Sequence, residues 1–420
     1  MSWKKKRTAE PHRAGNIPPA KPCRFSASPS RRFPGVLAIT HARSRLWLGI
    51  FGVGSIVLIS LLLLWSRVPL RLLPTTTSWR PADFGALLIV IACWIAWMIP
   101  LDAVGGWFLP NRSRPGSIPF GRFATKWFRG VLIQAGLFVS AGLLILAFGR
   151  WNGIPAAAAA VFVMAVAIIA FQRHIAALGS GGRRVASDAA VERAMKQTSQ
   201  WGFTSLPVIV LDHDDPGFTG GVVGWPRFES VVIPAGSVAG LTPQELAVMI
   251  ARRLEAVRSG SRTRGVLVAL AWVLVGFVLS ALLPGAGVTS VGELAMTGLG
   301  FTLWTFIGLL TLPTISRQAS YAIDRKVIDR GVPAQTLRDT VRGLDRVQDD
   351  EPSRSAWIET IFHPVPSVEN RQAGAGGEYP FAWHAARMTL FVSWACMGVL
   401  ARAVHCNAGR PELWVMLPTD

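Results

Sequence analysis

Long apolar stretches dominate the pattern of hydrophobic and polar positions along the chain. Seven of them approach the ~20 residues that an α-helix needs to cross the hydrocarbon core of a bilayer. They cover residues 46–65, 84–101, 131–148, 155–171, 266–283, 294–313 and 388–404. The fourth stretch is short and rich in alanine, so a buried or re-entrant helix is the alternative there. The pattern predicts a mainly α-helical, polytopic membrane protein with about seven transmembrane helices.

Two long polar segments interrupt this series. They cover residues 172–265 and 314–387, on either side of the hairpin that the fifth and sixth apolar stretches form. In the first segment, a helix is predicted in 187–197, and strands are predicted in 206–212 and 228–234 around the glycine-rich stretch 217–224. We therefore expect a small α+β domain that the two-helix hairpin divides.

A further helix is predicted within LTPQELAVMIARRLEAVRSG, residues 241–260. Thr242 can cap its N-terminus, Pro243 suits the first helical position, and Glu245 completes a capping box three residues after the cap. Gly260 is a suitable residue to end the helix. The start and the end of this helix are therefore both marked in the sequence.

These patterns divide the chain into seven parts. Residues 1–45 are rich in Arg, Lys, Pro and Ser and contain a single acidic residue, which predicts a disordered basic tail. A targeting segment or an over-extended start are the alternatives for this tail. The other parts are four transmembrane helices in 46–171, a first half-domain in 172–265, a transmembrane hairpin in 266–313, a second half-domain in 314–387, a transmembrane helix in 388–404 and a C-terminal tail in 405–420.

Charge fits a membrane protein better than a nucleic-acid-binding one. The chain is 51% hydrophobic and only 16% charged, with a formal net charge of +19. Its basic residues lie mostly in the tail and between apolar stretches, where membrane topology explains them, so no nucleic-acid partner is expected. If every stretch crosses the membrane, the N-terminus and both polar segments are cytoplasmic and the C-terminus is outside. The linker 66–83, with three arginines on the outer side, departs from this rule.

Four stretches in order along the chain carry a resemblance to a known family. They resemble motifs of the integral-membrane zinc metallopeptidases of family M48, which include the bacterial HtpX-type heat-shock proteases and the CAAX prenyl proteases. The stretches are LTPQELAVMIARRLEAVRSG, SRQASYAIDRKVIDRG with Ser316, Arg317, Tyr321 and Asp324, HPVPSVENR with His363, Pro364, Ser367 and Arg371, and more loosely PGFTGGVVGWPRFESVVIPAG at the substrate-edge strand. The resemblance implies a gluzincin-like cytoplasmic domain and a bacterial inner-membrane location.

The sequence departs from this family at the metal site. In the family, two histidines of an H-E-x-x-H helix and a downstream glutamate hold zinc, and the glutamate beside the first histidine is the general base. The resemblance maps the histidines onto Arg252 and Ala256, the base onto Arg253 and the downstream glutamate onto Ser320. It also implies that Asp324, Tyr321, His363 and Arg371 surround the ligands in active relatives. An arginine side chain neither binds Zn²⁺ nor accepts a proton from water, so no metal or other cofactor is expected.

The two arginines raise the question of what balances their charge. Arg253 continues an apolar helical stripe, so its side chain is expected to point inward, and Arg252 stands at the first-ligand position. A buried guanidinium needs a carboxylate nearby, and Asp324 is the best candidate. We therefore expect a guanidinium to replace the zinc cation. In the alternative, both arginines extend to water and Asp324 pairs with Arg325 or Arg317.

Three functions are compatible with these observations to different degrees. The leading hypothesis is a membrane-embedded, non-catalytic scaffold or regulator that binds membrane-protein or peptide segments, or a partner protease, at its glycine-rich edge strand, in contact with membrane lipid. The alternative is an active metalloendopeptidase that holds zinc through unforeseen ligands, such as Glu255 with Asp324 or His363. Glu255 is better explained by ion pairs with Arg252 and Arg258 on a solvated face, and His213 by a solvated acidic turn. A transporter is disfavoured, because charges are nearly absent from the apolar stretches.

Overall fold

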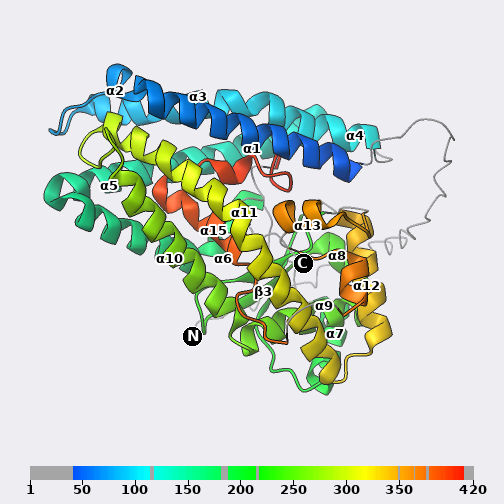
Figure 1. Ribbon diagram of the computed structural model, residues 1–420. Coiled ribbons are helices and arrows are strands. Elements are labelled where there is room, and N and C mark those ends of the chain that lie inside the picture. The colour runs from blue at the N-terminus through cyan, green and yellow to red at the C-terminus, as the bar shows by residue number, and fades with distance from the viewer. Residues whose placement is uncertain are drawn as a thin grey trace, which may run out of the picture. The chain divides into compact units, whose positions relative to one another are not determined.

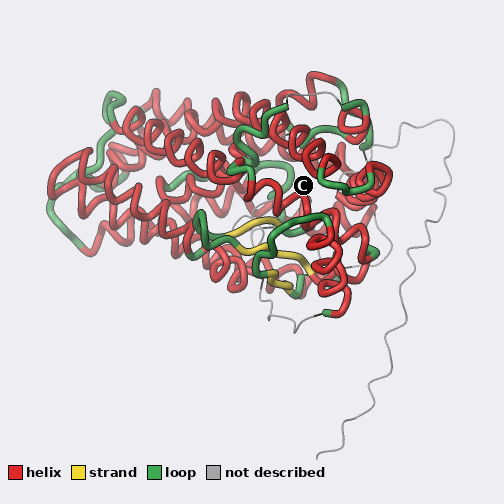
Figure 2. The backbone as a smooth tube through the Cα atoms, turned by 90° about the horizontal axis from the view of Figure 1, so that it is seen from below, coloured by secondary structure: helices red, strands yellow, loops and turns green. Residues whose placement is uncertain are grey.

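The fold is mainly helical, with one small β-sheet (Figures 1 and 2). The computed structural model describes residues 41–113, 118–180, 188–213, 217–348, 351–363, 365–374 and 378–410. The predicted C-terminal tail from residue 411 onward and most of the predicted basic tail lie outside the described residues. The predicted end of the basic tail at residue 45 is wrong, because helix α1 (His41–Ser66) already includes residues 41–45.

Five helices, rather than seven, are long and apolar enough to cross a membrane among the described residues. They are α1, α3 (Pro81–Ala103, continued to Arg112 through short helical turns), α5 (Phe120–Ala170), α10 (Ser261–Ala281) and α11 (Val291–Asp329). The third and fourth predicted spans both lie in α5, whose backbone is non-helical at Asn152 and Gly153, just before Pro155. Proline lacks the amide hydrogen that a continuous helix needs, which explains the break.

The seventh predicted span, residues 388–404, is wrong. Helix α15 (Ala385–Val392) is followed only by two 3-10 turns, η2 (Ser393–Cys396) and η3 (Leu400–Arg402). Eight residues of helix extend only about 12 Å, well short of the ~30 Å hydrocarbon core. The segment is apolar because it is buried in the protein: α15 packs beside α10 and α11 (Figure 1), and Trp394 lies in the main helical core. The C-terminus-outside orientation, which counted seven crossings, loses its basis.

The sheet has three strands in the order β1-β3-β2, which Figure 2 shows side by side. β1 (Val208–Leu211) pairs in parallel with β3 (Ser230–Pro234), and β2 (Gly221–Val223) pairs antiparallel with the other side of β3. The two predicted strands are confirmed, and β2 lies within the glycine-rich stretch. A side chain at Gly220 would place its Cβ 2.0 Å from the carbonyl oxygen of Val232, so the approach to β2 requires glycine.

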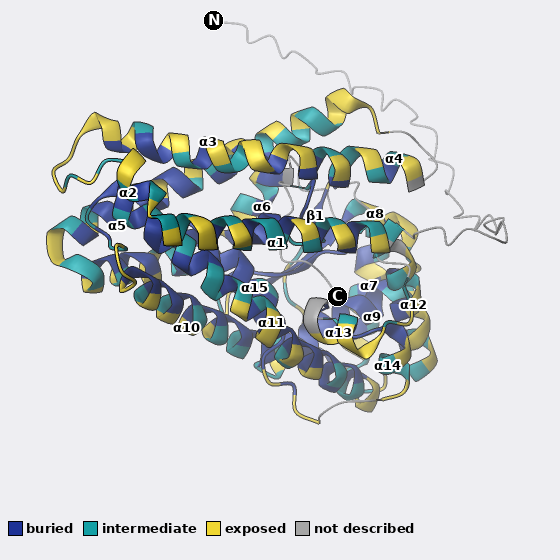
Figure 3. Cartoon of the chain, turned by 45° about the horizontal axis from the view of Figure 1, so that its top comes forward, coloured by how far each residue is buried: buried dark blue, intermediate teal, exposed yellow. Residues whose placement is uncertain are grey.

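Helix α9 (Pro243–Arg258) confirms the capping box. The Thr242 hydroxyl accepts a hydrogen bond from the Glu245 amide (3.2 Å), and the Thr242 amide donates to the Glu245 carboxylate (2.8 Å). All residues from Leu246 to Ala256 are buried, whereas α1 and α3 expose large apolar side chains along much of their length (Figure 3). Because α9 is surrounded by protein on every side, its two arginines are also inside.

The remaining elements are shorter than the five candidate membrane spans. They are α2 (Val68–Leu72), the π-helix η1 (Val104–Phe108), α4 (Leu109–Ser113), α6 (Gln172–Ser180), α7 (Ala189–Gln200), α8 (Ala235–Gly240), α12 (Ala334–Gln348), α13 (Ala356–Phe362) and α14 (Val368–Gln372). Helix α7 confirms the helix predicted in 187–197, and the Asp188 carboxylate caps it by accepting a hydrogen bond from the Ala190 amide (2.7 Å).

Residues from both polar segments share one hydrophobic core. It joins α7, α9 and the sheet to the C-terminal part of α11, to α12 and to Trp383. The main helical core, by contrast, is formed mainly by α5, α10, α11 and α15. The halves that the hairpin divides in sequence therefore pack together in space.

This shared core predicts the topology of both segments. Single cysteines at Arg258 and Ala373, in a chain whose four native cysteines are replaced by alanine, are expected to react with a membrane-impermeant maleimide from the same side of the membrane. The measurement is labelling of intact cells against permeabilised cells. Labelling of the two sites from opposite sides would contradict the arrangement. The cytoplasmic side itself stays a prediction from the arginine distribution.

Candidate functional site

The first-ligand position, Arg252, lies inside the protein and is bonded to Asp324. The residue is 1% exposed, and its Nε donates a hydrogen bond to Asp324 Oδ1 at 2.7 Å. Asp324 comes from α11, so this ion pair joins the two helices that supply ligands in the family that the sequence resembles. The predicted pairing is confirmed, and the alternative in which both arginines extend to water is wrong.

A second guanidinium completes the cluster. Arg371, on α14, donates from Nε to Asp324 Oδ2 at 2.7 Å and from Nη2 to Asp324 Oδ1 at 3.0 Å. This two-pronged geometry is the strong form of an arginine–carboxylate pair. The sequence indicated Arg371 as a neighbour of the site but did not predict this contact. One buried carboxylate thus lies between two arginines.

Arg253, at the general-base position, points towards the sheet. It is fully buried, and it donates to the carbonyl oxygens of Thr219 (2.7 Å) and Val232 (3.2 Å). Arg262 acts similarly at the other end of β2, where its Nη2 donates to the Gly224 carbonyl at 2.6 Å. Two arginines therefore bond to carbonyls on both flanks of the strand that was expected to receive a peptide.

The four residues at the family's ligand and base positions do not fit a zinc ion. Guanidinium groups only donate hydrogen bonds, and Ala256 carries no ligand atom. The Ser320 hydroxyl donates to the Ser316 carbonyl at 3.3 Å. Zinc sites in proteins use histidine, cysteine or carboxylate ligands. Among the described residues, no group of three or more His, Cys, Asp or Glu side chains is arranged to hold a metal ion.

Glu255 does not join Asp324 or His363, the set proposed for unforeseen zinc ligands. Its Oε2 lies 2.9 Å from Arg330 Nε and 4.0 Å from Arg258 Nε. Burial raises the pKa of the Glu255 carboxyl, against the opposing charges of Arg258 and Lys326. The expected pair with Arg258 is present, but the solvated face is wrong, because Glu255 is buried.

The other residues singled out from the sequence have separate surroundings. The Tyr321 hydroxyl donates to Glu359 on α13 at 3.4 Å. His363 is buried, and its ring lies 5.1 Å from that of His405. His213 is also buried and packs edge-on against Phe218, so the interpretation as a solvated turn is wrong. The ring that covers it belongs to Phe218, only five residues along the chain.

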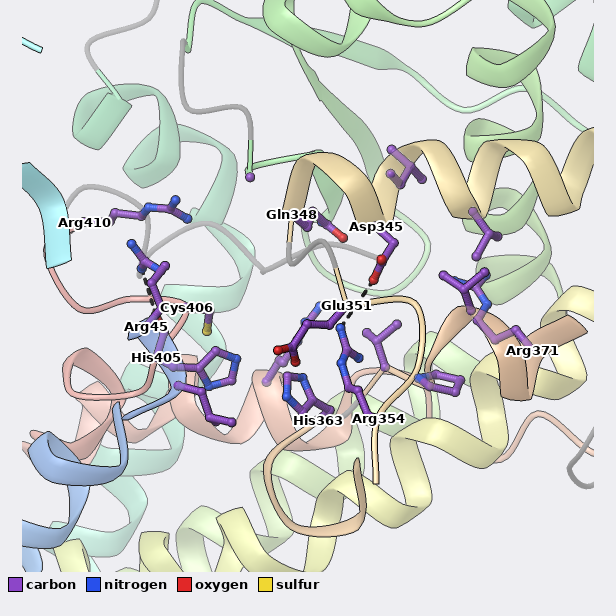
Figure 4. A pocket seen from close by; sticks show the side chains of 18 residues that line it. Arg45, Asp345, Gln348, Glu351, Arg354, His363, Arg371, His405, Cys406 and Arg410 are labelled. Carbon is purple, nitrogen blue, oxygen red and sulfur yellow. Dashed lines mark hydrogen bonds and ion pairs between the residues drawn. The ribbon is translucent and has the colours of Figure 1, made fainter. Parts of the chain in front are cut away.

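A polar cavity adjoins the Asp324 cluster (Figure 4). Arg371 lies at one end of it, His363 and Arg354 lie near the middle, and His405 lies towards the other end. Its volume is about 80 Å³. The sequence did not predict it, because its walls come from the start of α1, from α12 and from the segment after α15.

Sequence reasoning also missed a buried charge cluster among the membrane helices. Arg402, in the wrongly predicted seventh span, donates from Nη2 to Asp102 Oδ2, and both residues are 0% exposed. Trp127 Nε1 (2.9 Å) and the Gly409 amide (2.8 Å) also donate to the Asp102 carboxylate. An arginine within an apolar stretch was the available signal, since ionisable groups at membrane depth are usually paired.

Comparison with known proteins finds a similar fold in a solved structure. No family model and no curated protein matches the sequence. The crystal structure of S. mikatae Ste24p is similar, with a TM-score of 0.63 and 13% sequence identity over 80% of this chain and 86% of that chain. The chain has a Ste24-like fold. This likeness supports the membrane fold that the four sequence stretches implied, and the number and boundaries of the helices follow from the structure above.

Proposed function

We propose that this chain is a non-catalytic relative of the membrane metallopeptidases, in which a guanidinium takes the place of the zinc ion. The observation that carries the proposal is the Arg252–Asp324 ion pair at 2.7 Å, with Arg371 on the other side of the same carboxylate. Zinc in the family links the H-E-x-x-H helix to the downstream ligand helix. Here a positive side chain makes the same link between α9 and α11.

The chemistry of peptide hydrolysis is absent from this set of residues. Hydrolysis by a zinc peptidase needs a metal-bound water and a base that removes its proton. Arg253 is a permanent donor whose guanidinium is bonded to two carbonyl oxygens, so it does not act as that base. The side chain of Ala256 is a buried methyl group, which can neither bind zinc nor accept a proton. The proposed role is therefore that of a scaffold or regulator in the membrane.

Partner binding is proposed for membrane-protein or peptide segments, including those of a partner protease. The edge strand β2 is a limited docking site as it stands, because all three of its residues are buried and its flanking carbonyls are bonded to Arg253 and Arg262. A peptide that adds to this strand has to open it first. Binding at β2 should therefore be weak unless the partner displaces one of these arginines.

Metal content and proteolysis test the proposal. Purified full-length protein is expected to hold much less than one zinc per chain by elemental analysis and to leave an unfolded membrane substrate intact. An active peptidase of the same fold, prepared identically, is the positive control. About one zinc per chain, removed by a chelator together with a proteolytic activity, would overturn the non-catalytic function.

A further inference from the structure

An apolar groove runs between α1 and α11, two of the helices long enough to cross a membrane. Its volume is about 240 Å³. Its walls include Ile50, Val53 and Gly54 of α1, Leu309 and Leu310 of α11, and Leu390 of α15. The apolar walls of the groove suit a hydrocarbon chain.

The groove adjoins the polar cavity of Figure 4. Both are lined by Leu46, Arg387, His405 and Cys406, which stand between them. The polar cavity is rich in positive charge. Its lining contains Arg45, Arg354, Arg371, Arg387 and Arg410 against Asp345 and Glu351, and Asp324 outside the lining offsets Arg371. An apolar groove therefore lies beside a cationic chamber.

Both acidic side chains of the chamber already face arginines. Glu351 lies 3.0 Å from Arg43, and Asp345 lies 3.4 Å from Arg354. The positive charge of Arg387 stands at the wall where the groove and the chamber meet. An anion at this wall would gain favourable charge interactions in a partly dehydrated setting, where they are stronger than in water.

The junction is held in a fixed shape. Arg45 donates hydrogen bonds to the carbonyl oxygens of Gly105 (2.9 Å), His405 (2.8 Å) and Ala408 (3.2 Å). Gly49 allows the segment at His405 to lie directly against α1, because a Cβ there would come within 2.6 Å of His405 Cβ. The groove and chamber are thus built by specific contacts between α1 and the C-terminal segment.

We propose that this groove and chamber bind an anionic membrane phospholipid. Part of one acyl chain lies between α1 and α11, and the head-group phosphate lies beside Arg387. The excess of arginines favours an anionic over a zwitterionic head group, and the position on two candidate membrane spans favours a lipid of the surrounding bilayer over a soluble ligand. The site shares Arg371 with the Asp324 cluster, but it does not depend on whether the protein is catalytic.

Two substitutions address the two ends of the proposed ligand. Gly54→Leu fills the groove, and a Cβ at this position meets no atom within 4 Å, so the new side chain starts without a backbone clash. Gly85→Leu on α3 is the matched control, since Gly85 has equally open surroundings and does not line the groove. Arg387→Gln removes the charge at the wall, and Arg193→Gln on the exposed surface of α7 is its control.

The experiment measures lipid binding to purified full-length protein in neutral detergent micelles. Phosphatidylglycerol and phosphatidylcholine with identical acyl chains are titrated, and binding is followed by native mass spectrometry and by the shift in unfolding temperature. Phosphatidylglycerol is expected to bind about tenfold more tightly than phosphatidylcholine, as one charge-assisted contact allows. Gly54→Leu and Arg387→Gln should each weaken phosphatidylglycerol about tenfold, while the two controls bind like the wild type.

Three outcomes would contradict the proposal, each in a different way. Equal binding of the two lipids would show only general contact with the bilayer. Glycerol 3-phosphate binding as tightly as phosphatidylglycerol would indicate a free anion site with no use for the groove. Displacement of the lipid by an acidic peptide that binds Gly54→Leu unchanged would indicate a peptide site. If Gly54→Leu fails to fold, the comparison of the three ligands on the wild type still decides.

Discussion

Replacing Asp324 with alanine is expected to lower the free energy of unfolding by about 3 to 5 kcal/mol. The substitution leaves Arg252 and Arg371 without the carboxylate that both of them contact. A buried guanidinium without a counter-ion is costly because it has lost its hydration and has no carboxylate to take the place of water. The link between α9 and α11 is lost at the same time.

Equilibrium unfolding in mixed detergent micelles measures this effect. Asp329→Ala is the matched control, since it removes an exposed carboxylate from the same helix, and it should change the stability by less than about 0.5 kcal/mol. Asp324→Asn separates charge from shape and should fall close to Asp324→Ala. Equal stabilities of Asp324→Ala and Asp329→Ala would contradict a buried ion-pair cluster.

A double variant tests whether the pair acts as a unit. Arg252→Met with Asp324→Leu replaces two charges with apolar groups of similar size, and such replacements are often neutral in protein interiors. Because Arg371 still faces the site, recovery should be partial. The double variant is nevertheless expected to be more stable than Asp324→Ala, and the coupling between positions 252 and 324 gives the energy of the contact.

The family resemblance predicted this contact, because it placed Arg252 at the first-ligand position and Asp324 on the helix that faces it. The apolar stripe of α9 predicted only that Arg253 points inward, which its burial confirms. Arg371 was named but not paired, since its approach depends on how the chain returns through α13 and α14 over 47 residues. Local patterns carry no information about such a return path.

The wrong seventh span has a different physical origin. An apolar stretch of about 17 residues indicates burial in a non-aqueous environment, and hydrocarbon and protein interior satisfy it equally well. Two features distinguished them here. Met397 adopts a left-handed backbone conformation (φ 58°) before Gly398, which ends the helical path, and Arg402 is a charge that lipid would not accommodate. The break at Met397 and Gly398 lies in the middle of the segment and Arg402 lies near its end, and the average hydropathy conceals both.

Asp102 is the ion-pair partner of Arg402 among the membrane helices. Asp102→Ala should lower the free energy of unfolding by at least about 3 to 5 kcal/mol, because Arg402 stays buried and loses its counter-ion. The Trp127 indole and the Gly409 amide lose an acceptor in the same substitution. Since Gly409 belongs to the C-terminal segment, the segment should also become a better substrate for limited proteolysis.

Variants that remove different parts of the Asp102 cluster distinguish loss of the Asp102–Arg402 pair from a general defect in packing. Trp127→Phe removes one hydrogen bond and keeps the ring, so it should cost about 1 kcal/mol, whereas Asp339→Ala on the exposed face of α12 should be close to neutral. An Asp102→Ala protein as stable as Trp127→Phe would mean that Arg402 finds another partner. Stronger loss in Asp102→Ala, with cleavage confined to the region after α15, is the result expected if the Asp102–Arg402 pair holds the C-terminal segment in the helical core, where the seventh span was predicted to cross the membrane.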